Sequence, residues 1–281
     1  MKVSYSDYRG YLNCPRQFKL RKDKVEPPAK PSKYFALYGI LIESFFRLYT
    51  NKYSKEGAVL TDDQIRNILS GFWSHILKEN YVDWHEPWVK LTSNDIYERA
   101  YEDVKKNLAA FDFWKSSRSE VSYNVLLKKS QDNLSCRMDF VRDVPEGTEI
   151  IDGKGTDKID TNVDVEQLYF YALVHLLSNK KLPTKLGFLY YRYQLLKYLD
   201  FDMSTIINFK DKLSITKTAM KEDKEFLPKV GLSKQCKWCE YRFTCNAFTS
   251  KKEANAEKRG HIIPIEPTGS VVEFGPGGHS A

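Results

Sequence analysis

The sequence predicts an α/β fold in which helices cover both faces of a mixed central sheet. The chain has 281 residues, of which 42% are hydrophobic and 14% aromatic, so it can bury one large core. Apolar residues recur with a helical period through most of the first 113 residues. The period changes to two over residues 119–155, which indicates strands, and a helix and a further strand follow.

The N-terminal part is predicted to be helical. Ser4 to Arg21 forms a helix that Pro15 divides in two, because proline lacks the amide hydrogen that an internal helical position needs. A proline-rich connection at residues 25–33 leads to an amphipathic helix from Phe35 to Tyr49, and residues 60–113 are mostly helical.

Three strands are predicted in succession, at residues 119–130, 134–143 and 148–155. A helix from Asp164 to Leu177 and one long, tyrosine-rich strand from Leu186 to Leu196 come next. A polar helix from Thr205 to Asp223 completes the predicted core elements.

We expect residues 1–250 to form a single domain with a helical insertion at about 55–115. Residues 251–281 are expected to be a flexible tail in which the sequence VVEF could add one strand.

Composition restricts the possible classes of protein. The net charge of +7 is compatible with a polyanionic partner but does not require one. No apolar run reaches the roughly 18 residues of a membrane span, so no membrane partner is expected. The N-terminus lacks the apolar middle of a secretory signal, which favours a cytoplasmic protein. In that reducing setting, the five cysteines are not expected to form a disulfide framework.

The sequence EIIDGKG ends the third predicted strand with an acid and a base on either side of a glycine. Asp152 and Lys154 are two residues apart, so their side chains point to the same face of the strand. Asp139 lies in the neighbouring strand and can approach the same point. Two carboxylates beside an ammonium group can hold Mg²⁺ and assist the attack of water on a phosphoryl group.

The alternative is an ordinary surface ion pair, because a D-x-K triplet alone is common. Gln167 and Tyr171 weigh against that alternative, since they lie four residues apart on one face of the next predicted helix.

Together these segments resemble the PD-(D/E)XK nuclease superfamily, in its RecB-like branch of AddB-type and CRISPR-associated adaptation exonucleases. The matching residues are Asp139 in the second core strand, Asp152 with Lys154, and the Q-x-x-x-Y pair Gln167 and Tyr171. The resemblance implies a restriction-endonuclease-like sheet and a metal-dependent DNA nuclease, expected to be an exonuclease of recombination, repair or defence. It also implies that the carbonyl group of Gly153 binds the metal, Mg²⁺ or Mn²⁺.

One position departs from the branch. The spacing from Gly39 places Glu43 where this branch usually has a histidine ligand. A carboxylate is an acceptable ligand for a hard cation, so we expect Glu43 to bind the metal with Asp139 and Asp152.

Three cysteines follow the spacing C-x2-C-x5-C at Cys236, Cys239 and Cys245, and Cys14 is the expected fourth ligand of a closed metal site. Cys136 fits a small buried side chain better. By resemblance to iron–sulfur nucleases, residues 4–22 and 234–246 hold a 4Fe–4S cluster that joins the two ends of the domain. Four thiolates suit Zn²⁺ equally well by geometry.

Basic and aromatic residues surround these cysteines, among them Arg16, Lys19, Trp238 and Arg242. This composition is typical of a channel for single-stranded nucleic acid, and DNA with a free end is the expected partner. Equally, the aromatic side chains could pack around the cluster while the basic ones are solvated.

Two further functions remain open. The chain could be a catalytically inactive iron–sulfur DNA-binding or scaffold subunit of a helicase–nuclease complex. A helicase partner would have to supply the motor, because no G-x4-G-K-[ST] phosphate loop is present. A weaker possibility is a zinc-containing RNA-binding protein.

Overall fold

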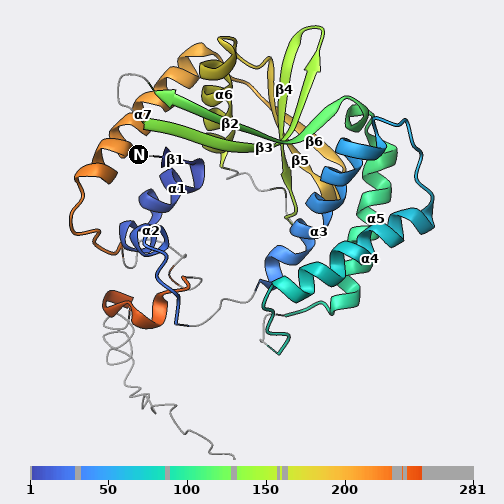
Figure 1. Cartoon of the computed structure of the whole chain (residues 1–281), viewed down its shortest axis with the longest axis horizontal. Helices are drawn as coiled ribbons and strands as arrows, with labels where there is room; N and C mark the ends of the chain where they lie inside the picture. Colours follow the sequence, from blue (N-terminus) through green and yellow to red (C-terminus); the bar gives the residue numbers. More distant parts are fainter. Residues whose placement is uncertain are drawn as a thin grey trace, which may run out of the picture.

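A computed structural model describes residues 2–28, 33–85, 89–127, 132–156, 159, 164–229, 236 and 239–248 (Figure 1). The helices are α1 (Tyr5–Asn13), α2 (Pro15–Lys22), α3 (Tyr34–Leu48), α4 (Asp62–Glu79), α5 (Ser93–Ala110), α6 (Val165–Asn179) and α7 (Met203–Glu222). The strands are β1 (Lys2–Val3), β2 (Ser117–Leu127), β3 (Asp132–Val144), β4 (Gly147–Lys154), β5 (Lys185–Tyr190) and β6 (Leu195–Leu199). No helix in the described part of the chain is long and apolar enough to cross a membrane.

The strands form one mixed sheet with the order β1-β3-β4-β5-β6, and β2 pairs with β3. Strands β2, β3 and β4 are antiparallel neighbours, as expected from their short connections. Strand β5 is parallel to β4, and helix α6 makes the connection between them.

Along one of its sides, strand β3 pairs first with β1 and then with β4. Its beginning pairs with β1 at Asn133 and Leu134, and its end pairs with β4 from Phe140 onward. Residues 135–139 therefore lie between these two partners, at a fork in the sheet. Asp139 is the last residue before β4 joins.

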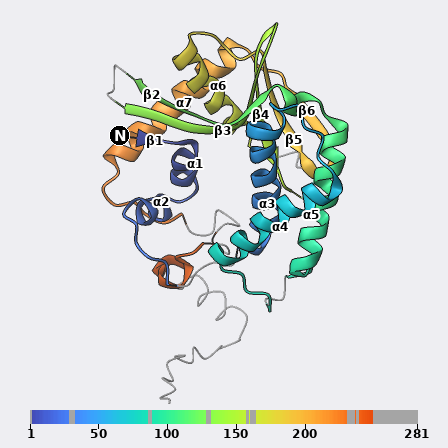
Figure 2. The ribbon, with the colours of Figure 1, turned by 45° about the vertical axis from the view of Figure 1, so that its right-hand side comes forward.

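Helices cover both faces of the sheet, as predicted (Figures 1 and 2). On one face, α3, α4 and α5 pack an aromatic-rich core against β3 to β5, including Phe46, Trp114 and Phe140. On the other face, α1, α6 and α7 pack against the sheet through residues such as Phe170 and Phe209. Burial of these apolar side chains is the main stabilising contribution to the arrangement.

Local sequence signals explain several of the helix boundaries. Ser4, Thr61 and Thr92 each cap a helix through a reciprocal capping box. The predicted break before Pro15 is confirmed, because Cys14 has an extended backbone between α1 and α2.

The prediction of one long strand from Leu186 to Leu196 is wrong. Strand β5 ends at Tyr190, a 3₁₀ turn follows at Tyr191–Tyr193, and β6 returns antiparallel to β5. Gln194 makes the turn with a left-handed backbone, φ 46°, that its residue type does not announce. The short strand β1 was also not predicted, since two residues carry no periodic signal.

Candidate active site

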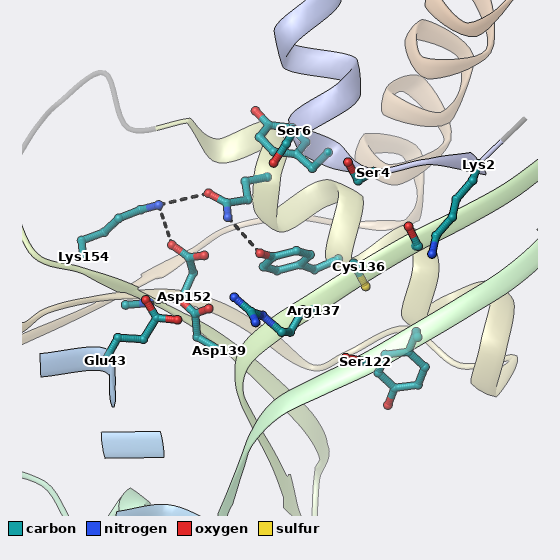
Figure 3. Close-up of a pocket in the computed structure, with 16 residues that line it drawn as sticks. Lys2, Ser4, Ser6, Glu43, Ser122, Cys136, Arg137, Asp139, Asp152 and Lys154 are labelled. Atoms are coloured by element: carbon teal, nitrogen blue, oxygen red, sulfur yellow. Dashed lines mark hydrogen bonds and ion pairs between the residues drawn. The ribbon is translucent and has the colours of Figure 1, made fainter. Parts of the chain in front are cut away.

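A cavity of about 690 Å³ opens at the fork in the sheet (Figure 3). Its lining comes from β1, α1, α3, β2, β3, β4 and α6. The predicted residues that line it are Glu43, Asp139, Asp152, Gly153, Lys154, Gln167 and Tyr171. The fold thus brings together every residue that the sequence placed in the catalytic site.

Four side chains from β4 and α6 form a continuous line of polar contacts. The Lys154 ammonium lies 2.5 Å from a carboxylate oxygen of Asp152 and donates a hydrogen bond of 3.1 Å to Oε1 of Gln167. Nε2 of Gln167 donates a hydrogen bond of 2.9 Å to the hydroxyl of Tyr171. Gln167 and Tyr171 are about one turn apart on α6, so Tyr171 can hold the side-chain amide of Gln167. That amide in turn holds Lys154 beside Asp152.

Asp152 is buried and Asp139 is half-buried, and both line the same cavity. Asp152 is 2% exposed, and Oδ2 of Asp139 accepts a 2.9 Å hydrogen bond from the backbone amide of Gly153. Burial raises the pKa of the Asp139 carboxyl well above its ordinary value, and the charges of Asp152 and Glu43 raise it further. Burial likewise raises the pKa of the Asp152 carboxyl, while the charge of Lys154 opposes that rise. A cation between the two aspartates would offset the repulsion between their charges.

Glu43 approaches the aspartates from α3 (Figure 3). Burial raises the pKa of its carboxyl, while the charges of Arg137 and Arg47 oppose that rise. Arg137 also lines the cavity and pairs with Glu120 at 3.1 Å. Sequence reasoning missed Arg137, although its position two residues before Asp139 places it on the same face of β3.

Comparison with known proteins decides the family. A family model of the PD-(D/E)XK nuclease superfamily matches residues 2–246. The chain belongs to this superfamily. No curated protein matches the chain significantly.

Two solved structures are similar to the nuclease chain, but only remotely. One, from Eubacterium rectale, is described as a "putative exonuclease" and is 10% identical, with 78% of this chain and 80% of that chain covered and a TM-score of 0.47. The other, SSO0001, is 14% identical, with 88% and 86% covered and a TM-score of 0.38. Scores this low add nothing to the family assignment.

The acids of the candidate site offer the donors that a hard divalent cation prefers. Carboxylate and carbonyl oxygens are the usual ligands of Mg²⁺, and Glu43, Asp139, Asp152 and Gly153 can present them from one cavity wall. Within the described ranges, no group of three His, Cys, Asp or Glu side chains is already arranged to hold a metal. The donor chemistry fits a cation, and binding one would require these carboxylates to turn toward it.

Tyr191 is a second residue beside the site that sequence reasoning missed, and its position explains why residue 153 is a glycine. A Cβ atom at Gly153 would lie 2.1 Å from the hydroxyl oxygen of Tyr191. Burial raises the pKa of Tyr191 well above its ordinary value, and the charges of Asp139, Glu43 and Asp152 add to this. Tyr191 falls inside the long strand predicted from Leu186 to Leu196, and the unpredicted turn hid its closeness to the acids.

A second cavity, of about 280 Å³, lies between α2 and the segment 239–248, and Cys14, Cys239 and Cys245 line it. Burial raises the pKa of the Cys239 thiol, and the nearby Cys14 and Cys236 contribute to the rise. No disulfide joins any of the five cysteines, all of which are among the described residues. Cys136 instead lines the acidic cavity, where burial raises its pKa to about 12.

The two ends of the domain meet at these cysteines (Figure 2). Nε of Arg21 lies 2.5 Å from Glu240, and the Tyr241 hydroxyl donates to the carbonyl of Val25 at 2.9 Å. Protein groups therefore hold these two segments together, whether or not a metal binds the cysteines.

The described residues among those predicted to bind DNA do not line the cavity of Asp139 and Asp152. Arg16 lines the second cavity. Lys19 pairs with Asp23 at 3.0 Å, and Arg242 lies over the ring of Phe243 at 4.6 Å. Trp238 lies outside the described residues.

Proposed function

We propose that this chain is a metal-dependent DNA nuclease of the RecB-like branch that hydrolyses phosphodiester bonds from a free end. The line of contacts from Asp152 through Lys154 to Gln167 and Tyr171, beside Asp139, is the observation that carries the proposal. A surface ion pair would not need a buried acid or a helix that orients the lysine.

Each residue has a role in this proposal. Glu43, Asp139, Asp152 and the carbonyl group of Gly153 would hold Mg²⁺ or Mn²⁺. The bound cation would supply an activated water and stabilise negative charge on the phosphoryl group. Lys154 stabilises the charge that develops on the phosphoryl oxygens, because its ammonium is already fixed beside the acids.

We further propose that Cys14, Cys236, Cys239 and Cys245 bind a structural 4Fe–4S cluster, with Zn²⁺ as the alternative. Support comes from the cavity that three of these cysteines share and from the influence of Cys236 on the thiol of Cys239. A cluster there would reinforce the contact between the two ends of the domain.

DNA is the proposed substrate, and recombination, repair or defence is the proposed setting. The net charge of +7 favours a polyanion without choosing between DNA and RNA. A helicase is the partner that such a nuclease would use to expose single strands. Arg16, Lys19, Trp238 and Arg242 are proposed to contact the strand near the cluster.

The test of the enzymatic proposal is cleavage of end-labelled single-stranded DNA, double-stranded DNA and RNA in Mg²⁺, Mn²⁺ or EDTA. We expect metal-dependent cutting of DNA, and the product ladder gives the direction of digestion. DNA binding without cutting by the metal-loaded protein would instead support the scaffold function.

The cluster has its own test, which does not depend on cleavage. Protein purified without oxygen should contain iron and sulfide and absorb visible light, and Cys239→Ser should lose that absorbance. Cys136→Ser is the matched control and should keep it, because Cys136 lies in the other cavity. Stoichiometric zinc in place of iron would establish the alternative metal.

A further inference from the structure

Tyr191 has a buried hydroxyl group that lacks a partner. The residue is 2% exposed, and its hydroxyl oxygen makes no hydrogen bond within the described part of the chain. Buried hydroxyl groups are nearly always hydrogen-bonded, because removing them from water is otherwise unfavourable. An unpartnered one beside a proposed active site therefore requires an explanation.

The surrounding structure fixes Tyr191 in this position. Its backbone carbonyl accepts hydrogen bonds from Nδ2 of Asn107 at 2.6 Å and from Nε2 of Gln194 at 2.8 Å. Its ring stacks on that of Phe46, with centroids 5.5 Å apart and planes at 6°. Phe46 follows Glu43 by three residues on α3, so the same helix carries a proposed metal ligand and holds the tyrosine ring.

The hydroxyl of Tyr191 is directed at the backbone that joins Asp152 to Lys154. It occupies the space where a side chain on Gly153 would stand. The amide of that same glycine donates to Asp139. Among charged groups, Asp139 acts most strongly on the Tyr191 hydroxyl, and Glu43 comes next.

We propose that Tyr191 is a positioning residue that donates a hydrogen bond to the Asp139 carboxylate when a divalent cation binds. The inference rests on the proposed function. A carboxylate that binds a metal through one oxygen keeps acceptor capacity for hydrogen bonds. The amide of Gly153 supplies one donor to Asp139, and Tyr191 supplies a second from the core side of the sheet. Such donors orient a ligand and increase its affinity for the metal.

The substitution Tyr191→Phe tests this role, because it keeps the ring and its stacking on Phe46 and removes only the hydroxyl. Titration calorimetry with Mn²⁺ alone should show at least about a tenfold weaker Kd in the variant, as for other groups that orient metal ligands. The melting temperature should not fall, since no hydrogen bond of the described structure is lost. Cleavage should need more Mn²⁺ for half-maximal rate, and excess Mn²⁺ should restore most of the kcat.

Tyr49→Phe is the matched control. Tyr49 is 8% exposed and stacks on Phe45 in the same aromatic core, with ring planes at 9°. The site acids are not among the groups that raise its pKa. This variant should bind Mn²⁺ as the wild type does.

The outcomes separate this inference from the function on which it rests. If wild type and Tyr191→Phe bind Mn²⁺ equally and wild type cuts DNA, Tyr191 is only a packing residue and the inference is wrong. If wild type neither binds Mn²⁺ nor cuts, the proposed function fails and the inference fails with it.

Discussion

The ammonium of Lys154 donates to Gln167 at 3.1 Å, so a residue of helix α6 holds the lysine at the end of strand β4. This contact joins the D-x-K motif of Asp152 and Lys154 to the Q-x-x-x-Y motif of Gln167 and Tyr171 in one site. We expect Gln167 to position Lys154 without taking part in the chemistry itself.

That dependence can be measured with a double-mutant cycle. Lys154→Ala should reduce kcat by about 100-fold or more, the usual loss for a group that stabilises transition-state charge. Gln167→Ala should reduce it less, and adding Gln167→Ala to the lysine variant should change kcat little, because the group it positions is gone. Single-turnover rates at saturating metal provide the comparison.

The control for Lys154 is Lys105→Ala, which removes another ion-paired lysine, 2.6 Å from Asp62 in the helical insertion. Its rate should match that of wild type. Fully additive losses in the cycle would show that Gln167 acts independently of the lysine.

Gly153→Ala should destabilise the fold as well as the site. The added Cβ would meet the Tyr191 hydroxyl at 2.1 Å, and the stacked ring cannot move aside easily. Overpacking of this kind typically costs about 1–3 kcal/mol, which urea denaturation would detect. Gly71→Ala is the control: nothing lies within 4 Å of its added Cβ, so its stability should not fall. An unchanged Gly153→Ala protein would contradict the close packing of Tyr191.

Substitutions at Glu43 test the effect of a glutamate where the RecB-like branch usually has a histidine ligand. Glu43→Gln removes the negative charge and should weaken Mn²⁺ binding strongly, whereas Glu43→His supplies another metal-binding group and should keep part of the activity. Calorimetry and cleavage rates over a range of Mn²⁺ concentrations would show both effects. Wild-type Mn²⁺ affinity in Glu43→Gln would remove Glu43 from the ligand set.

Glu149 makes stability depend on pH from outside the catalytic site. Its side chain is 1% exposed and pairs with Arg142 at 2.5 Å and Lys185 at 3.0 Å. Burial raises the pKa of the Glu149 carboxyl, but hydrogen bonds from Lys185 and Arg142 outweigh this, and the net direction is down from 4.5. The folded pKa is thus below the unfolded one, so the stabilisation is complete above about 4.5 and is lost as the pH falls.

Glu149→Gln should therefore cost about 2 kcal/mol at pH 7, as expected for a hydrogen-bonded charge. The difference from wild type should shrink as the pH is lowered below 4.5. Urea denaturation at several pH values checks the sign, and a difference that grows toward acid would contradict it.

Much of this architecture could be predicted from the sequence. The change of period located β2, β3 and β4, and the spacing of Asp152 with Lys154 and of Gln167 with Tyr171 fixed which side chains share a face. These are local properties, which periodicity reports directly.

Other features depend on contacts between distant segments. The hairpin of β5 and β6 has no glycine or proline at its turn, and Gln194 takes a left-handed backbone that sequence patterns do not indicate. Tyr191 consequently looked like one more residue of a long apolar strand. Its closeness to Gly153 appears only once α3, β4 and the turn are packed together.

The central claim is that Asp152 belongs to a metal-dependent phosphodiesterase site, and its direct test compares wild type with Asp152→Ala. End-labelled single-stranded DNA would be incubated with each folded protein in Mn²⁺ and in EDTA. We predict cutting by wild type in Mn²⁺ alone and none by the variant under either condition. Cutting by Asp152→Ala at the wild-type rate, or cutting that persists in EDTA, would contradict the account.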